Sequence, residues 1–118
     1  MNNKEIGKLG EDFTIDFLNK RGFIILERNY KVPLGEVDII AQKGDLLIFI
    51  EVKTRRNLDF GIPAEAVDRT KQTRIKKIAE LYISTKKPKF KKIRFDIMSI
   101  ILSKSGKILD WEYLINAF

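Results

Sequence analysis

Two strand-like segments, residues 36–42 and 46–54, flank a Lys43-Gly44-Asp45 turn, and this pattern constrains the fold more than any other feature. Apolar runs of this length on either side of a glycine-containing turn are typical of an antiparallel hairpin. A two-residue loop at Gly44-Asp45 fixes the register, since it pairs the residues immediately before and after it. The sequence therefore predicts which side chains of the two strands lie opposite one another.

This register brings charged side chains together at the end of the hairpin far from the turn. It places Asp38 opposite Glu51 and Glu36 opposite Lys53. Directly opposed residues share a face, with their Cβ atoms roughly 5 Å apart. Two carboxylates at that separation can share a metal ion. A shift of one residue would put Asp38 and Glu51 on opposite faces, so the hypothesis depends on this pairing.

The remaining hairpin side chains are apolar on both faces near the turn, which predicts a hairpin covered on both sides. One face is Val37, Ile39, Ala41, Ile48, Ile50 and Val52, and the other carries Ile40, Leu47 and Phe49. Charges placed there are expensive to desolvate unless they are paired or bind metal. The alternative is a surface hairpin with Glu–Lys cross-strand pairs, each contributing a few tenths of a kcal/mol.

The rest of the chain predicts one α/β domain over residues 1–118, with the element order α-β-β-β-α-β-β. We expect helices at about 4–21 and 64–85, and strands at 23–30, 36–42, 46–54, 94–102 and 108–114. Turns are expected at 33–35 and 105–106, and a loop at 55–63. Nothing in the sequence indicates a repeat or a second domain.

The chain has no cysteine and no histidine. Thiolate zinc sites, cysteine nucleophiles and histidine acid–base schemes are therefore excluded. A metal would be held by oxygen ligands, which favours Mg²⁺ or Mn²⁺. The sequence has no apolar run long enough for a membrane span and no secretory signal, so we expect a cytoplasmic location without a membrane partner.

Positive charge is concentrated between Arg69 and Arg94, which contains eleven lysines and arginines and one acid, Glu80. This segment has a net charge of +10. Because the whole chain has a net charge of +7, the remaining residues together carry −3. This asymmetry favours a polyanion such as nucleic acid as partner. The alternative is a solvated helix face followed by a lysine-rich loop.

The core motif of the PD-(D/E)XK nuclease superfamily resembles two segments of this chain, Gly35-Glu36-Val37-Asp38 and Glu51-Val52-Lys53-Thr54-Arg55. One position departs from the motif: Val37 stands where the P in the superfamily's name denotes a proline. The whole chain is similar to the YraN-like family, whose members resemble archaeal Holliday-junction resolvases. Further matches are Gly10-Glu11, Arg28-Asn29, Phe60-Gly61, Lys71-Gln72 and Arg94-Phe95-Asp96.

The resemblance implies a restriction-endonuclease-like core, with a central mixed sheet flanked by helices. It implies a metal-dependent nuclease for structured or branched DNA, with Asp38, Glu51 and Lys53 as catalytic residues. Asp38 and Glu51 would bind Mg²⁺ or Mn²⁺, and Glu11 would support the metal from the first helix. Similarity to junction resolvases also implies a homodimer, because a four-way junction offers two symmetric cuts.

Four further residues are candidates for nucleic-acid contacts: Arg55, Lys71, Gln72 and Arg74. On sequence alone, Lys71 and Gln72 could equally be ordinary exposed helix residues, and Glu11 a solvent-facing acid. The aromatic residues Trp111, Tyr113 and Phe118 are interpreted as core or interface residues rather than base-stacking platforms.

Two other functions stay open. A non-catalytic nucleic-acid-binding module could retain the fold and its acids, because fold does not fix function. An interaction protein could be basic in order to dock on an acidic partner. Metal binding distinguishes the nuclease from the module, and indifference to every form of DNA would favour the interaction protein.

Overall fold

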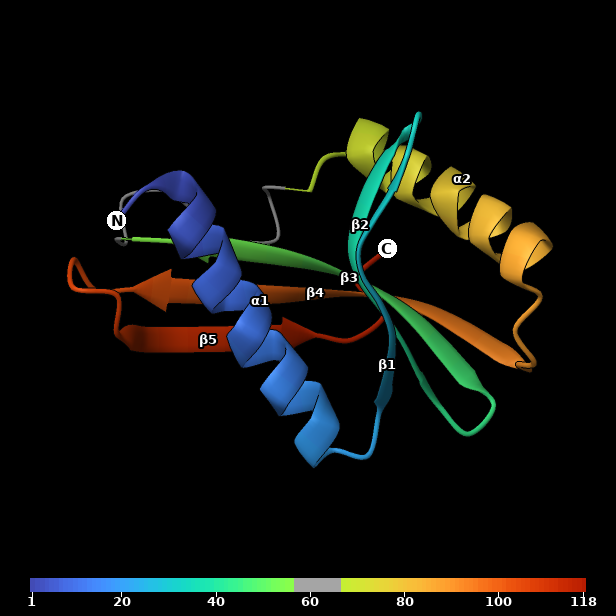
Figure 1. Cartoon of the computed structure of the whole chain (residues 1–118), viewed down its shortest axis with the longest axis horizontal. Helices are drawn as coiled ribbons and strands as arrows, with labels where there is room; N and C mark the ends of the chain where they lie inside the picture. The colour runs from blue at the N-terminus through green and yellow to red at the C-terminus, as the bar shows by residue number, and fades with distance from the viewer. Residues whose placement is uncertain (57–66) are drawn as a thin grey trace.

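The computed structural model describes residues 1–56 and 67–118, which form an α/β fold in the predicted element order. Among these residues, five strands make one mixed sheet in the order β1-β2-β3-β4-β5 (Figure 1). The strands are β1 (Ile24–Val32), β2 (Gly35–Lys43), β3 (Leu46–Arg55), β4 (Lys92–Leu102) and β5 (Ile108–Leu114). Neighbours are antiparallel except β3 and β4, which are parallel.

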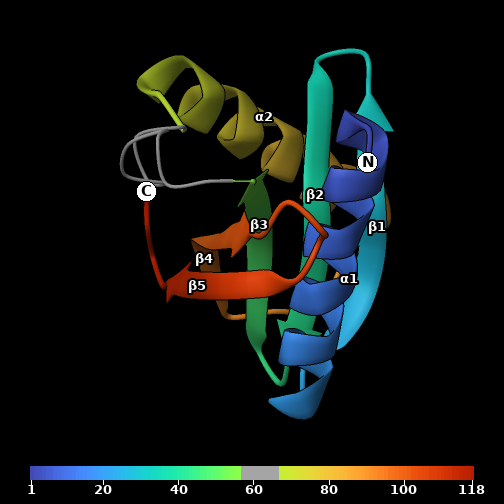
Figure 2. The ribbon, with the colours of Figure 1, turned by 90° about the vertical axis from the view of Figure 1, so that its left-hand side faces the viewer.

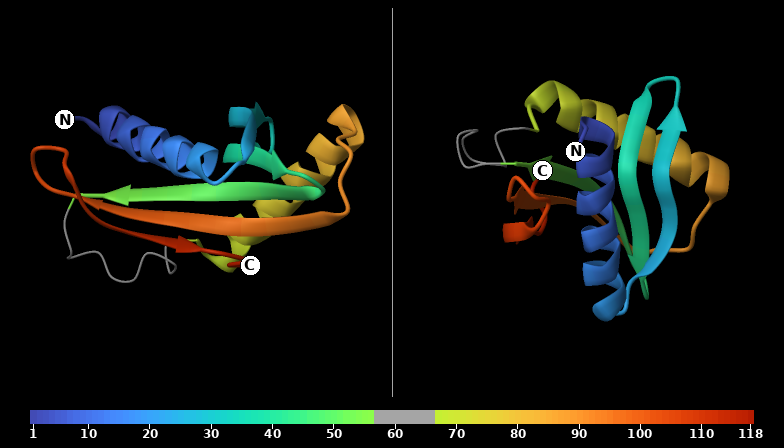
Figure 3. Two further views of the ribbon diagram at one scale, coloured as in Figure 1. Left: turned by 90° about the horizontal axis from the view of Figure 1, so that it is seen from below. Right: turned by 60° about the vertical axis from the view of Figure 1, so that its left-hand side comes forward.

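Helices α1 (Asn3–Lys20) and α2 (Arg69–Lys86) lie on opposite faces of the sheet (Figures 2 and 3). The core under α1 includes Leu18, Ile39, Ala41, Ile48 and Ile50. The core under α2 includes Ile40, Leu47, Phe49, Ile78 and Tyr82. The hairpin is therefore covered on both faces, as its apolar pattern predicted.

The ends of the helices follow from their capping residues. The Asn2 side chain accepts a hydrogen bond from the Glu5 amide at 2.9 Å, which satisfies a free donor of the first turn of α1. Asp68 caps α2 in the same way, accepting from the Lys71 amide at 2.8 Å. The prediction that this helix begins near residue 64 is wrong, because residues 67 and 68 precede it.

Other boundaries differ by one or two residues. Strand β1 extends to Val32 and β4 begins at Lys92, while β5 has its predicted bounds. Residues 64–66, Phe60-Gly61 and most of the predicted loop 55–63 lie outside the described residues; Arg55 itself ends β3. In the described part of the chain, neither helix combines the length and apolar character needed to cross a membrane.

The predicted hairpin register is confirmed from Lys43–Leu46 to Ile39–Ile50. Gly44 takes a φ of 57° in the turn, a conformation that glycine favours. The ladder between β2 and β3 ends at the Ile39–Ile50 pair. Figure 1 shows why: β2 continues beside β1, whereas β3 continues beside β4. We call this point of separation the fork.

The fork corrects three predictions. Asp38–Glu51 and Glu36–Lys53 are not among the ladder pairs, because the two strands have separated there. Glu36 is exposed, and its carboxylate lies 3.9 Å from the Nζ of Lys31 on β1. Val37 packs in the core under α2 rather than with Ile39 under α1. The alternation of side chains therefore breaks next to Asp38.

Candidate functional site at the fork

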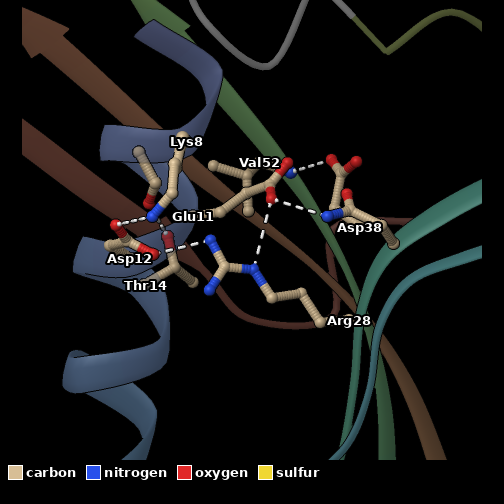
Figure 4. Close-up of polar contacts among 9 residues, drawn as sticks. Lys8, Glu11, Asp12, Thr14, Arg28, Asp38 and Val52 are labelled. Carbon is tan, nitrogen blue, oxygen red and sulfur yellow. Dashed lines mark hydrogen bonds and ion pairs between the residues drawn. The ribbon is translucent and has the colours of Figure 1, made fainter. Parts of the chain in front are cut away.

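Asp38 lies in the fork, just beyond the last main-chain pair between β2 and β3. There its side chain, rather than its main chain, contacts β3. Its Oδ2 accepts a hydrogen bond from the Val52 amide at 2.8 Å (Figure 4). Asp38 is only 8% exposed and Glu51 only 5%. Burial, and next the negative charge of Glu51, raise the pKa of Asp38 from 3.8 to about 8. The two acids therefore form a closely coupled, desolvated pair, although they are not ladder partners.

Two lysines converge on the Glu51 carboxylate. Lys71 is the third residue of α2. Its Nζ lies 2.7 Å from Oε1 of Glu51. The Nζ of Lys53, two residues along β3, lies 3.8 Å from the same oxygen. Residues i and i+2 of a strand point to the same side, so β3 itself brings Lys53 to this carboxylate.

The environments of the two lysines act in opposite directions. Burial, followed by the hydrogen bond and charge of Lys71, lowers the pKa of Lys53. For Lys71, burial acts to lower the pKa, but hydrogen bonds to Glu51 and Lys53 and the nearby acids outweigh it and raise the pKa. Lys71 therefore holds its positive charge firmly, whereas Lys53 gives up its proton more readily than an ordinary lysine.

Glu11 reaches the same region from α1 but is held by β1. Its Oε1 accepts a hydrogen bond from Nδ2 of Asn29 at 3.1 Å. The same oxygen lies 3.5 Å from Nε of Arg28 (Figure 4). The Glu11 side chain is 16% exposed, so it does not face solvent freely. Its charge contributes to raising the pKa of Asp38. Glu11 is thus a neighbour of the acid pair.

A close helix–strand contact explains why glycine precedes Glu11. A Cβ added at Gly10 would lie 1.8 Å from Oγ1 of Thr54 and 3.0 Å from its Cβ. Neither atom could accept such an approach without a shift of the helix or a rotation of Thr54. Gly10 therefore lets α1 lie against β3 at a depth that brings Glu11 beside the fork.

Asp38 and Glu51 are the residues that fit a metal ion. Carboxylate oxygens are the donors that Mg²⁺ and Mn²⁺ prefer, and Mg²⁺ usually takes one or two carboxylates from a protein. A cation at this pair would offset the repulsion that helps to raise the pKa of Asp38. Within residues 1–56 and 67–118, no group of three acids is placed to hold a metal ion, and Glu11 contacts Arg28 and Asn29 instead.

The four residues predicted to contact nucleic acid are not gathered in one place. Arg55 lines a hollow beside the start of α1, and Arg74 is exposed on α2. Gln72 is half-buried and donates a hydrogen bond to the Val67 carbonyl at 3.0 Å, which is a structural contact at the start of the helix. Lys71 faces Glu51 rather than solvent.

Lys71 could have been placed beside the acids from the sequence. It lies four and seven residues before Ile75 and Ile78, which are buried against the sheet, so it begins the inner stripe of α2. The interpretation of the aromatic residues as core holds for Tyr113 and Phe118, which pack against the cores under α1 and α2 respectively. Trp111 is 42% exposed, although the centre of its ring lies 5.1 Å from that of Phe17.

In the described part of the chain, the fold and the site define a small α/β protein with a mixed five-stranded sheet, and with two buried acids and two half-buried lysines clustered at a fork between strands. Residues 10–100 match the family described as "Uncharacterised protein family UPF0102". The chain belongs to this family, which is the YraN-like family indicated by its motifs.

Several relatives match over essentially the whole chain. A UPF0102 protein of Dictyoglomus turgidum is 73% identical over 118 residues, covering 100% of both chains. A UPF0102 protein of Caldicellulosiruptor saccharolyticus is 44% identical, again covering 100% of both. A third, from Alkaliphilus metalliredigens, is 44% identical over 115 residues and 98% of each chain. The described domain is therefore similar to these relatives at full length.

Proposed function

We propose that this protein is a cytoplasmic, metal-dependent nuclease with a restriction-endonuclease-like core, which hydrolyses phosphodiester bonds in structured or branched DNA. The observation that carries the proposal is the coupled pair of buried acids, Asp38 and Glu51, with the amine of Lys53 beside them. A buried acid whose pKa is raised by burial and by a neighbouring carboxylate is typical of functional sites rather than of surface hairpins.

Asp38 and Glu51 would hold Mg²⁺ or Mn²⁺. Glu11, whose carboxylate contacts Arg28 and Asn29, would support the metal from α1 through its negative charge. When bound, such an ion neutralises charge on the phosphate and makes a metal-bound water easier to deprotonate. Asp38 is oriented for this role by its hydrogen bond to the Val52 amide. Glu51 is fixed by its contacts with two lysines.

Lys53 would act on the phosphate or on the attacking water. Its lowered pKa leaves more of its amine in the neutral form that can accept a proton, and its protonated form can stabilise charge that develops on the phosphate. Lys71 would keep a positive charge beside Glu51 throughout. DNA cut at two symmetric positions would require a homodimer.

The test is cleavage of labelled four-way junctions, flaps, plain duplexes and single strands, with Mg²⁺ and with Mn²⁺. Asp38→Asn and Glu51→Gln are matched blanks, because each keeps the size of its side chain and removes its charge. We expect at least one DNA structure to be cut by the wild type and by neither variant. Equal cutting by all three proteins would reveal a contaminant and refute the assignment.

One observation favours a second function, a nucleic-acid-binding module without cleavage. The Glu51 carboxylate is already paired with Lys71 at 2.7 Å, so the acids could persist as a buried ion-pair network. DNA binding by a wild-type protein that neither binds Mn²⁺ nor cleaves would support this module.

A further inference from the structure

A second basic surface lies along the side of α2 that adjoins the β1–β2 turn, and we call it the basic groove. It is an open hollow of about 410 Å³ between α2 and the β1–β2 turn. The residues that line it are Leu34, Arg69, Thr70, Thr73, Arg74 and Lys77. Three cations and two hydroxyl groups therefore converge on one hollow, and none of these described lining residues is acidic.

The cations of the basic groove are held close together without matching acids. Arg69, Arg74 and Lys77 are all exposed, and none of them forms an ion pair with an acid in the described ranges 1–56 and 67–118. Like charges gathered along a helix repel one another. An anionic ligand would relieve this repulsion, and the hydroxyl group of Thr70 could donate a hydrogen bond to its oxygens. The Thr73 hydroxyl donates instead to the Arg69 carbonyl, at 2.9 Å.

The position of Arg74 is built into the fold. A Cβ added at Gly35 would lie 2.9 Å from Cδ of Arg74, so the absence of a side chain at Gly35 lets the Arg74 stem pack against β2. Leu34, next to Gly35, forms the opposite wall and is 43% exposed. The β1–β2 turn thus shapes the basic groove and fixes one of its three cations.

The basic groove and the acid site share the first turns of α2. Lys71 contacts Glu51, whereas Arg69 and Arg74 line the groove. From there α2 runs along the molecule to a lysine-rich connection (Figure 1). The exposed lysines of this connection and its flanks are Lys86, Lys87, Lys89, Lys91 and Lys92. An 18-residue helix is about 27 Å long.

We propose that the basic groove binds the sugar–phosphate backbone of a duplex arm, which follows α2 away from the bond held at Asp38 and Glu51. This inference rests on the proposed function only in taking the polyanion to be DNA. It does not require that the DNA is cleaved. Phosphate contacts of this kind position a duplex without reading its sequence. At about 3.4 Å per base pair, the length of α2 corresponds to an arm of about 8 base pairs.

The test compares two triple variants in EDTA, where no cleavage occurs. Arg69→Gln/Arg74→Gln/Lys77→Gln removes the groove cations. The control, Lys20→Gln/Lys104→Gln/Lys107→Gln, removes three exposed positive charges elsewhere. Fluorescence anisotropy measures binding to labelled duplexes and four-way junctions with arms of 4 to 16 base pairs, from 50 to 300 mM NaCl. Duplex RNA and polyglutamate serve as competing polyanions, and circular dichroism checks folding.

We expect the groove variant to bind at least about tenfold more weakly at 50 mM NaCl than the control variant. Its slope of log affinity against log salt should fall by about 2 to 3, since each lost phosphate contact lowers the slope by about 0.9. Wild-type affinity should rise with arm length up to about 8 base pairs and then level off.

Three results would overturn the inference: equal losses in the two variants, no binding of duplex by the wild type, or equal competition by polyglutamate, which would indicate an acidic protein as the ligand. If the wild type cleaves DNA but the groove variant and the control variant bind it equally well, only the basic-groove inference is refuted. If the groove variant binds DNA more weakly than the control but the wild type cleaves none, only the proposed nuclease activity is refuted.

Discussion

Replacing Asp38 with asparagine tests the electrostatics of the fork with little change in shape. Asparagine retains an oxygen that can accept the hydrogen bond from the Val52 amide, but it cannot ionise. In the metal-free wild type, burial and the charge of Glu51 raise the pKa of Asp38 from 3.8 to about 8. The variant therefore removes the penalty of an ionised Asp38 and keeps its main-chain contact.

The sign of the pH dependence follows from this raised pKa. Between about pH 4 and pH 8 the folded protein retains a proton that the unfolded chain releases, so the free energy of unfolding falls as the pH rises. The slope approaches about 1.4 kcal/mol per pH unit. From pH 5 to pH 8 the loss amounts to about 3–4 kcal/mol, which corresponds to a decrease on the order of 10–20 °C in Tm for a domain of this size.

Thermal and urea unfolding at pH 5, 6, 7 and 8, in EDTA, measures this loss. The chain contains no histidine, the side chain that ordinarily titrates in this window, so the background slope should be small. We expect Asp38→Asn to show a nearly flat profile and to be the more stable protein at pH 8. A wild type as flat as the variant, or a variant less stable at pH 8, would refute the account of the acid pair.

Three further substitutions test separate contacts. Gly10→Ala should lower the free energy of unfolding in urea by about 1–3 kcal/mol, because its Cβ would collide with Thr54. The control Gly7→Ala should not destabilise the protein, because its Cβ would meet no atom within 4 Å. Equal effects of the two substitutions would contradict the close contact at Gly10. Lys53→Ala should bind Mn²⁺ as the wild type does but cleave at least about 100-fold more slowly; unchanged cleavage would remove its catalytic role. Lys71→Gln should bind Mn²⁺ several-fold more tightly, since its ammonium group no longer occupies the carboxylate it pairs with; weaker binding would show instead that this lysine supports the metal site.

The sequence predicted the hairpin well because local rules determine it. The glycine-containing turn sets the register, and the apolar alternation shows that both faces are covered; the structure confirms both as far as the Ile39–Ile50 pair. Beyond that pair, β2 and β3 follow different neighbours. The order of strands in the sheet decides this separation, and no pattern within the hairpin reveals it. The acids nevertheless meet, because the Asp38 side chain turns to the Val52 amide.

The contacts made by α1 and α2 were harder to predict. The charge of the basic segment indicated a polyanion surface, but charge alone could not show that Lys71 contacts Glu51 and that Arg74 lines the basic groove. Helical spacing shows the orientation of Lys71, which lies four and seven residues before the buried Ile75 and Ile78. The start of α2 is a separate matter, since its cap at Asp68 lies later than the hydrophobic pattern indicated. The contact of Glu11 with Arg28 and Asn29 depends on how deeply α1 packs, which only the three-dimensional fold reveals.

The most direct test of the central claim is isothermal titration calorimetry of Mn²⁺ into the metal-free protein at pH 8, where Asp38 can ionise. We predict one bound ion per chain in the wild type, and loss of that binding in both Asp38→Asn and Glu51→Gln. A wild type that releases no heat of binding, or variants that bind Mn²⁺ as tightly as the wild type does, would contradict the assignment of these two carboxylates as a metal site.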